Sequence, residues 1–311
     1  MSEAIEGLVF KSTGSWYRVR LKDRSFLDCR VRGKLKLAKF KTTNPVAVGD
    51  KVILTHDEHH EGTGIIGKIL HRENFVIRKS VHKTEHGHLL AANIDQAVLM
   101  ATLNHPKTSF GFIDRFLVST DAYRIPSVLL INKSDLHQPE DKELIEEIKA
   151  VYEDIGIKTY AISVKTGAGL EVLNDLLKGK ITLFAGHSGT GKSTLMNTLH
   201  QDINQEVGEV STFANKGIHT TTFAEMFELE KGTMVIDTPG IKELGLIDIG
   251  NHELSDYFPE MRALLGECKF NNCSHTHEPN CAVIEAIENG EISYSRYKSY
   301  LSMLENVDTR R

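Results

Sequence analysis

Eight consecutive residues near the middle of the chain have the types and spacing of a loop that binds phosphate groups. Residues 186–193 read Gly-His-Ser-Gly-Thr-Gly-Lys-Ser and fit the pattern G-x-x-x-x-G-K-[ST]. Glycines let backbone N–H groups close around phosphates, and the N-terminus of a following helix adds the positive end of its dipole. Lys192 is expected to reach the β- and γ-phosphates, and the Ser193 hydroxyl to bind Mg²⁺. The predicted residues of this loop are Gly186, His187, Ser188, Gly189, Thr190, Gly191, Lys192, Ser193 and Thr194.

A second polar segment indicates which base is bound. Residues 132–135 read Asn-Lys-Ser-Asp, and the Asp135 carboxylate can accept hydrogen bonds from N1–H and N2–H₂ of guanine. Adenine offers neither donor, so such a site disfavours ATP by a factor on the order of 10⁴. Residues 163–165, Ser-Val-Lys, are similar to the S-A-K loop that backs a bound guanine. The predicted base-site residues are Asn132, Lys133, Ser134, Asp135, Ser163, Val164 and Lys165, with Asn132 and Lys133 bracing the base and the phosphate loop.

A third motif indicates where magnesium and the γ-phosphate are held. Residues 237–240 read Asp-Thr-Pro-Gly and fit D-x-x-G, in which Asp237 meets Mg²⁺ and the Gly240 N–H meets the γ-phosphate. Residues 217–222, Gly-Ile-His-Thr-Thr-Thr, lie where a first switch segment belongs. One of its threonines, Thr220 or Thr221, is expected to bind Mg²⁺, and Thr221 is favoured.

The residue that positions the attacking water is not the usual one. Ras-like enzymes place Gln after the D-x-x-G glycine, whereas this chain has Ile241, which cannot orient water. His219 can take that role from the first switch segment. The alternative is a surface histidine on a mobile loop.

The order of these motifs predicts a circularly permuted domain. The guanine motif at Asn132 precedes the phosphate loop at Gly186, and Asp237 follows both, whereas ordinary GTPases begin with the phosphate loop. Strands and helices alternate without a break through the junction, so one fold with relocated ends is expected rather than two half-domains. Residues 239–245 then run directly into the C-terminal part, where the state of the γ-phosphate can be transmitted.

A cluster of cysteines and histidines lies near the C-terminus. Cys268, Cys273 and Cys281, with His275, offer three thiolates and one imidazole, which is the ligand set of a closed structural zinc site. His277 competes with His275 on spacing alone. Cys29 stands apart and is expected to be a buried strand residue.

The elements that must position these residues change in type along the chain. The first 70 residues predict five short strands, as in a β-barrel of the OB-fold type, and residues 71–90 resemble a linker. Strands and helices then alternate up to residue 236, which predicts a doubly wound α/β domain. From about residue 250 only short helices are expected. The predicted domains are an OB-fold barrel at 1–72, a GTPase domain at 73–245 and an α-helical zinc-binding domain at 246–311.

Charge is distributed unevenly. Residues 1–90 contain 17 Lys/Arg against 10 Asp/Glu, while the whole chain of 311 residues has a net charge of −5. This basic block predicts contact with a polyanion, and its alternative is a solvated basic face. Its alternating cations are Arg18, Arg20, Arg30, Arg32, Lys34 and Lys36.

Trp16, Tyr17 and Phe26 could stack bases, although Phe26 is expected in the barrel core.

The chain has no run of 18 apolar residues and no secretory signal at its N-terminus, so we expect a cytoplasmic protein without a membrane segment.

Together these motifs resemble the RsgA family, the GTPases that depend on the small ribosomal subunit. The resemblance covers nearly the whole chain. It implies a cytoplasmic, monomeric GTPase that binds GTP/GDP, Mg²⁺ and one structural Zn²⁺. It further implies that the small subunit and its rRNA are partners, with other assembly factors, late in subunit maturation. The family's G-x-H-T-T histidine falls on His219, and its zinc ligands fall on Cys268, Cys273, His275 and Cys281.

Two other classes of function stay open at this point. One is an RNA-binding protein whose guanine-nucleotide site is mainly structural or regulatory. The other is a phosphotransferase that uses the phosphate loop, against which Asp135 argues because it selects guanine.

Overall fold

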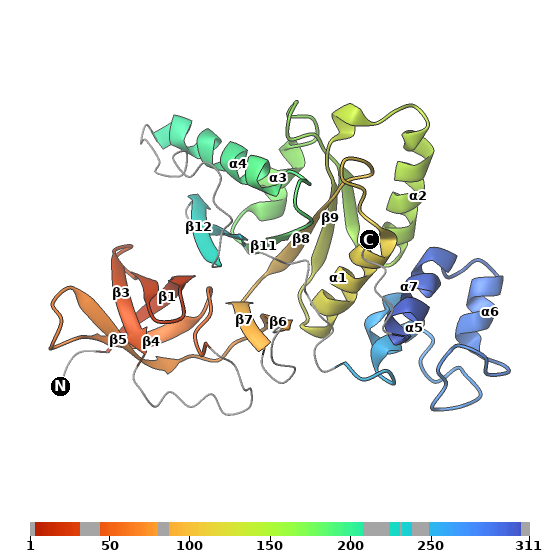
Figure 1. Ribbon diagram of the computed structural model, residues 1–311, viewed down its shortest axis with the longest axis horizontal. Helices are drawn as coiled ribbons and strands as arrows, with labels where there is room; N and C mark the ends of the chain where they lie inside the picture. The colour runs from red at the N-terminus through yellow and green to blue at the C-terminus, as the bar shows by residue number, and fades with distance from the viewer. Residues whose placement is uncertain are drawn as a thin grey trace. The chain divides into compact units, whose positions relative to one another are not determined.

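The structure is a computed structural model, and it describes residues 4–31, 44–79, 87–207, 224–230, 232–237 and 249–305 (Figure 1). The chain divides into two compact units. The first unit comprises Met1–Val98, Leu170–Gly186 and Lys192–Glu243, and the second comprises Leu99–Gly169, His187–Gly191 and Leu244–Arg311. Across the described residues, no helix combines the length and apolar character that crossing a bilayer requires.

The first unit begins with the five-stranded barrel that the sequence predicts. Its strands are β1 (Ile5–Ser12), β2 (Tyr17–Leu21), β3 (Phe26–Val31), β4 (Lys51–His56) and β5 (Thr63–Ile69). Strand β1 pairs with both β2 and β4, and the ring closes through β2–β3, β3–β5 and β5–β4. Alternate side chains fill the interior, among them Val9, Tyr17 and Cys29. The prediction that Cys29 is a buried strand residue is confirmed, because none of it is exposed.

The prediction of a linker over residues 71–90 is wrong. Strands β6 (Phe75–Lys79) and β7 (Gly87–Ala92) form an antiparallel pair. Val76, Ile77 and Leu89 are buried, so the pair has an apolar side. The many charged and histidine residues between 78 and 88 hid these two short apolar runs, because composition averages over a segment while burial follows alternation.

The remainder of the first unit extends the sheet beyond the barrel. Its elements are α3 (Glu171–Leu177), β11 (Ile181–Ala185), α4 (Lys192–Val207), β12 (Glu225–Glu230) and β13 (Thr233–Asp237). Strand β11 is parallel to β13, and β12 is antiparallel to both β13 and β1. The sequence did not predict β12, whose three glutamates obscure its buried Met226 and Leu229.

The second unit contains the strands that precede the predicted guanine motif and the 163–165 loop. Its elements are the end of β8 (Gln96–Ala101), α1 (Phe110–Ala122), β9 (Ser127–Ile131), α2 (Asp141–Asp154) and β10 (Lys158–Ala161), with a short 3-10 helix, η1 (Ser134–Leu136), after β9. The strands lie in the order β10-β9-β8, and β10 is parallel to β9. Every residue of β8 is buried, as its continuous apolar sequence predicts. The Ser109 side chain caps α1 by accepting a hydrogen bond from the Phe112 N–H.

The same unit ends in a helical module. Its elements are η3 (Leu254–Tyr257), α5 (Pro259–Arg262), α6 (Ala282–Glu288) and α7 (Tyr294–Leu304), and α7 lies alongside α1 (Figure 1). Val118 of α1 belongs to the apolar core of this module, together with Leu254, Phe258 and Tyr300. As predicted, the described residues from 249 to 305 contain no strand.

Candidate nucleotide site, metal cluster and polyanion face

The predicted phosphate loop connects β11 to α4, which is the strand–loop–helix context that the motif requires. Gly189 and Gly191 have φ values of 84° and 100°, where residues with a Cβ are strained. At Gly191 a Cβ would also collide with the Asn132 amide nitrogen. The second and third motif glycines are therefore needed for the observed course of the backbone.

Asn132 holds the phosphate loop from the end of β9. Its Nδ2 donates to the Thr190 carbonyl oxygen at 2.8 Å, and its Oδ1 accepts from the Val164 N–H at 3.1 Å. The side chain is 2% exposed, so these bonds are shielded from water. One amide thus joins the phosphate loop to the 163–165 loop, and these two segments are predicted to hold opposite ends of a nucleotide.

The predicted guanine clamp, Asp135, is oriented by a neighbouring hydroxyl. Ser163 Oγ donates to Asp135 Oδ1 at 2.6 Å, and Lys165 Nζ lies 3.9 Å from Oδ2. The Ser163 hydrogen bond lowers the pKa of Asp135, so the group stays ionised. An ionised carboxylate is the acceptor that the N1–H and N2–H₂ donors of guanine require. Ser134 donates its N–H to the Ile162 carbonyl oxygen, which fastens the clamp to the end of β10.

Lys133 has a left-handed backbone, with a φ of 69°, and its Nζ donates to the carbonyl oxygen of His105. The segment that contains His105 also lies close to the phosphate loop, because a Cβ placed on Gly189 would come within 3.4 Å of the Pro106 ring. The predicted bracing role of Lys133 therefore runs through this neighbouring segment.

Two apolar supports of the phosphate loop were missed by sequence reasoning. Phe112 of α1 stacks on His187, with ring centroids 3.8 Å apart and planes inclined by 29°. Pro106 is the other support. No local pattern marks either residue, since their partners lie about 80 positions later in the chain.

Lys192 and Asp237 lie in the first unit, at the start of α4 and the end of β13. Lys192 Nζ donates to the Gly186 carbonyl oxygen at 2.5 Å. Burial raises the pKa of Asp237, Lys192 opposes that rise, and Glu225 adds to it. A partly buried carboxylate beside a second acid is a suitable place for a cation, and carboxylate and hydroxyl oxygens are hard ligands of the kind Mg²⁺ prefers. Asp237 and Ser193 therefore fit a magnesium ion chemically.

Part of the predicted site lies outside the described residues. His219, Thr220, Thr221 and Gly240 belong to this part, and so does Ile241. Their roles stay predictions.

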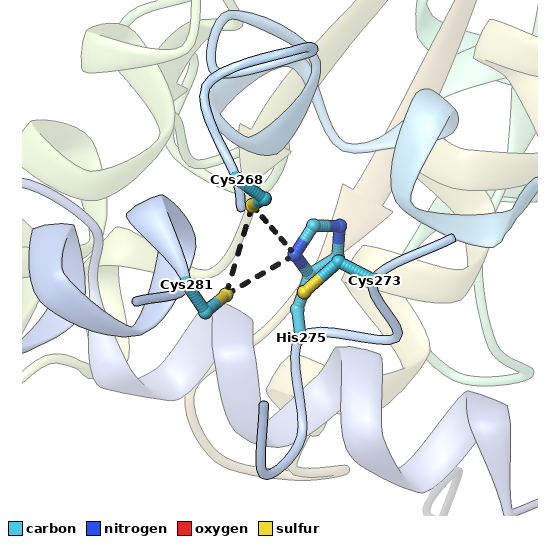
Figure 2. A group of neighbouring side chains, drawn as sticks. All are labelled: Cys268, Cys273, His275 and Cys281. Carbon is cyan, nitrogen blue, oxygen red and sulfur yellow. Dashed lines mark hydrogen bonds between the residues drawn. The ribbon is translucent and has the colours of Figure 1, made fainter. Parts of the chain in front are cut away.

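The Cys/His cluster of the helical module brings four ligand atoms together (Figure 2). The His275 Nδ1 atom lies 3.7 Å from Cys268 Sγ and 3.4 Å from Cys281 Sγ, and these two sulfur atoms are 3.9 Å apart. All four ligand atoms, including Cys273 Sγ, lie within 4.8 Å of one another. Tetrahedral Zn²⁺ with its usual bond lengths separates sulfurs by about 3.8 Å and sulfur from nitrogen by about 3.5 Å. The cluster therefore fits zinc.

The competing ligand His277 is exposed, and its Nδ1 lies 2.8 Å from Thr276 Oγ1. Burial lowers the pKa of His275, which favours the neutral imidazole that binds metal. The geometry thus groups His275 with the cysteines.

Arginines and aromatic rings alternate on the outer face of the barrel. The Arg30 guanidinium lies 4.0 Å from the Trp16 ring centroid, and the Arg18 guanidinium lies 4.7 Å from the Phe26 ring centroid. Phe26 is 44% exposed, so its expected place in the barrel core is wrong. Tyr17 fills the core instead, since alternation along β2 turns it inward. Arg32, Lys34 and Lys36 lie outside the described residues.

Comparisons with known proteins match the chain over nearly its full length. A sequence model of the RsgA GTPase matches residues 69–247, and one of the RsgA N-terminal domain matches residues 6–65. A relative named small ribosomal subunit biogenesis GTPase RsgA, from Cytophaga hutchinsonii, is 48% identical, and the match covers 99% of this chain and 100% of the relative. RsgA 2 of Bacteroides thetaiotaomicron is 46% identical, with 98% and 97% covered.

Two solved structures are also similar to this chain over nearly its full length. The crystal structure of YjeQ from Thermotoga maritima superposes with a TM-score of 0.77 at 35% identity, covering 99% of this chain and 100% of that one. YloQ, described as a circularly permuted GTPase, gives a TM-score of 0.73 at 29% identity, covering 99% and 96%. The permuted order of motifs is therefore a property of the fold. The chain belongs to the RsgA family of circularly permuted GTPases.

Proposed function

We propose that this GTPase acts in biogenesis of the small ribosomal subunit, as the names of its relatives state for them, and that it binds the subunit's rRNA. The proposal draws on the basic block of residues 1–90 and on the exposed arginine–aromatic face of the barrel. A protein of this kind works in the cytoplasm, where subunits are assembled, and we infer that it does so as a monomer. Other assembly factors are further partners in this proposal.

The nucleotide site of the proposal is the one that Asn132 organises. Asp135 selects guanine, with Ser134 and residues 163–165 around the base. Lys192 and the backbone of residues 186–191 hold the phosphates, and Thr194 lies in the same helical turn. Ser193, Thr221 and Asp237 would hold magnesium, whose charge neutralises phosphate oxygens when it is bound. His219 orients the attacking water, and Gly240 contacts the γ-phosphate.

The single observation that carries this site is the hydrogen bond from Asn132 to Thr190. It joins the guanine motif to the phosphate loop inside one compact unit, although the two are separated by 58 positions in the chain.

The zinc ion in this proposal is structural. Cys268, Cys273, His275 and Cys281 supply four protein ligands, so no coordination position remains for a substrate. We further propose the domain division 1–72, 73–245 and 246–311, in which zinc stabilises the last domain.

The decisive experiment measures GTP hydrolysis with and without purified small subunits. We expect the subunits to accelerate hydrolysis and Lys192→Ala to abolish it in both conditions. Equal rates of the unaltered protein with and without subunits would contradict the ribosomal role while leaving the GTPase intact. Subunit binding that is insensitive to whether GTP or GDP is bound would favour the alternative, an RNA-binding protein with a structural nucleotide site.

A further inference from the structure

Three charged residues on three neighbouring strands lie directly opposite one another. Lys11 of β1 is the register partner of Glu225 on β12, and Glu225 is the register partner of Asp237 on β13. Both strand pairs are antiparallel, and residues opposite each other in antiparallel strands project from the same face with Cβ atoms about 5 Å apart. We call these residues the Lys11–Glu225–Asp237 row. It leads from the barrel to the predicted magnesium aspartate.

The barrel end of the row is an ion pair. Lys11 Nζ lies 3.0 Å from Glu225 Oε2, and the two side chains are 32% and 19% exposed. Glu225 is therefore a partly shielded carboxylate that pairs with a cation of the barrel, while its register partner on β13 is a second carboxylate. The charge of Glu225 makes the electrostatic potential at Asp237 more negative, and the charge of Lys11 offsets part of this effect.

We infer that Glu225 is a positioning residue for the magnesium ion at Asp237, and that Lys11 of the barrel sets how strongly its charge acts there. This inference rests on the proposed role of Asp237 in the nucleotide site. Glu225 is not assigned as a ligand of the ion. It acts through the field at Asp237, so its removal weakens the affinity for Mg²⁺, whereas removal of Lys11 strengthens it.

Through the row, binding of a ligand to the barrel can change the affinity of the nucleotide site for Mg²⁺. A polyanion that draws Lys11 away from Glu225 would leave the carboxylate less compensated and so increase the affinity for Mg²⁺ at Asp237. The electrostatic effect of Lys11 on Asp237 acts across two strand spacings, about 10 Å, so it should weaken as the salt concentration is raised.

The same strand provides a matched control. Glu228 also ties β12 to the barrel, because its Oε2 lies 2.8 Å from Arg20 Nη1 and 2.6 Å from Arg24 Nη2. Its register partner on β13, however, is Met234 rather than Asp237. Glu228→Gln therefore breaks a contact between barrel and β12 without touching the row.

The experiment follows the release of a fluorescent GDP analogue from the full chain as free Mg²⁺ is varied. We expect Glu225→Gln to raise the Mg²⁺ concentration that half-protects the nucleotide, and Lys11→Met to lower it, each by about two- to fivefold. Glu228→Gln should leave this Mg²⁺ concentration unchanged. Asp237→Asn should raise it by more than Glu225→Gln or Glu228→Gln does.

The outcomes separate the inference from the site on which it rests. If Asp237→Asn leaves the Mg²⁺ requirement unchanged, the proposed magnesium site is wrong. If Asp237→Asn changes the Mg²⁺ requirement but Glu225→Gln does not, the magnesium site is supported and the role of the row is rejected. The role of the row is also rejected if Glu228→Gln changes the requirement as much as Glu225→Gln does. Lys11→Met alters a partly exposed barrel residue and so keeps the test available if Glu225→Gln does not fold.

Discussion

Asn132 Nδ2 lies 2.8 Å from the carbonyl oxygen of Thr190, and this hydrogen bond joins the guanine motif to the phosphate loop. The Oδ1 atom of the same side chain accepts from the Val164 N–H. The amide is buried, so its hydrogen bonds to the two loops are shielded from competing water. This relation makes Asn132 a residue of the site's framework, whereas Asp135 is the residue predicted to select the base.

Asn132→Ala should lower the affinity for GDP and GTP by about tenfold or more, because buried groups left without a hydrogen bond cost roughly 1–3 kcal/mol. Equilibrium titration with a fluorescent GDP analogue measures the change. Asn132→Asp is the informative companion, since a carboxylate still accepts from Val164 but cannot donate to Thr190. If Asn132→Asp binds as well as the unaltered chain, the bond to Thr190 is unimportant.

Ser163→Ala should make nucleotide affinity more sensitive to acid. The Ser163 hydrogen bond lowers the pKa of Asp135, so the carboxylate that is predicted to accept from guanine persists to lower pH and is lost only as the pH falls through that lowered pKa. Without the hydroxyl the pKa rises, and affinity should begin to fall at a higher pH. Titrations of GDP between about pH 4 and 7 would show the shift, and superimposable pH profiles of the two proteins would refute it.

Removal of zinc should unfold the C-terminal helical module. Cys281 is one of the four residues that could hold the ion, and structural zinc supplies folding free energy to small domains. We expect Cys281→Ser to lose bound zinc, measured by atomic emission, and to lose helical circular dichroism. His277→Ala is the control and should retain one zinc ion per chain. Loss of zinc in His277→Ala would instead make His277 a ligand.

Arg296→Met should destabilise the second unit by about 3–5 kcal/mol, because it leaves buried carboxylates without their cation. Arg296 Nη1 lies 2.7 Å from Asp114 Oδ1 on α1, and its Nε lies 2.8 Å from Glu260 Oε1 on α5. Chemical denaturation measures the loss in the free energy of unfolding. Arg262→Met, which breaks an exposed ion pair with Asp121, should cost less than about 1 kcal/mol. Equal losses in the two variants would contradict the importance of burial.

Arg30→Glu should weaken binding to single-stranded RNA and reduce its dependence on salt, because fewer counterions are then released. Phe26→Ala should weaken binding without changing the salt slope, since a stacked base contributes about 1–3 kcal/mol independent of charge. Fluorescence anisotropy at several salt concentrations separates the two effects. Lys22→Glu is the control, because it changes the charge by the same amount at an exposed residue that pairs with Glu6. It should reduce the affinity for RNA less than Arg30→Glu does.

The sequence by itself determined the chemistry and most of the elements. The glycines of the phosphate loop, the Asp135 carboxylate and the three clustered cysteines were identified from residue type and spacing, because short motifs carry their chemistry locally. Spacing left His275 and His277 as alternatives. The barrel strands and the buried β8 followed from alternation and from a continuous apolar run. The permuted order needed only the positions of Asn132, Gly186 and Asp237 along the chain.

Only the tertiary structure decided which distant residues meet. The bond from Asn132 to Thr190, the stacking of Phe112 on His187 and the Lys11–Glu225–Asp237 row all join segments that are far apart in sequence. The exposure of Phe26 is of the same kind, because the inward or outward direction of a strand residue depends on the register of its neighbours. Periodicity reports which residues share a face, whereas strand pairing and packing, which depend on the whole chain, decide what that face contacts.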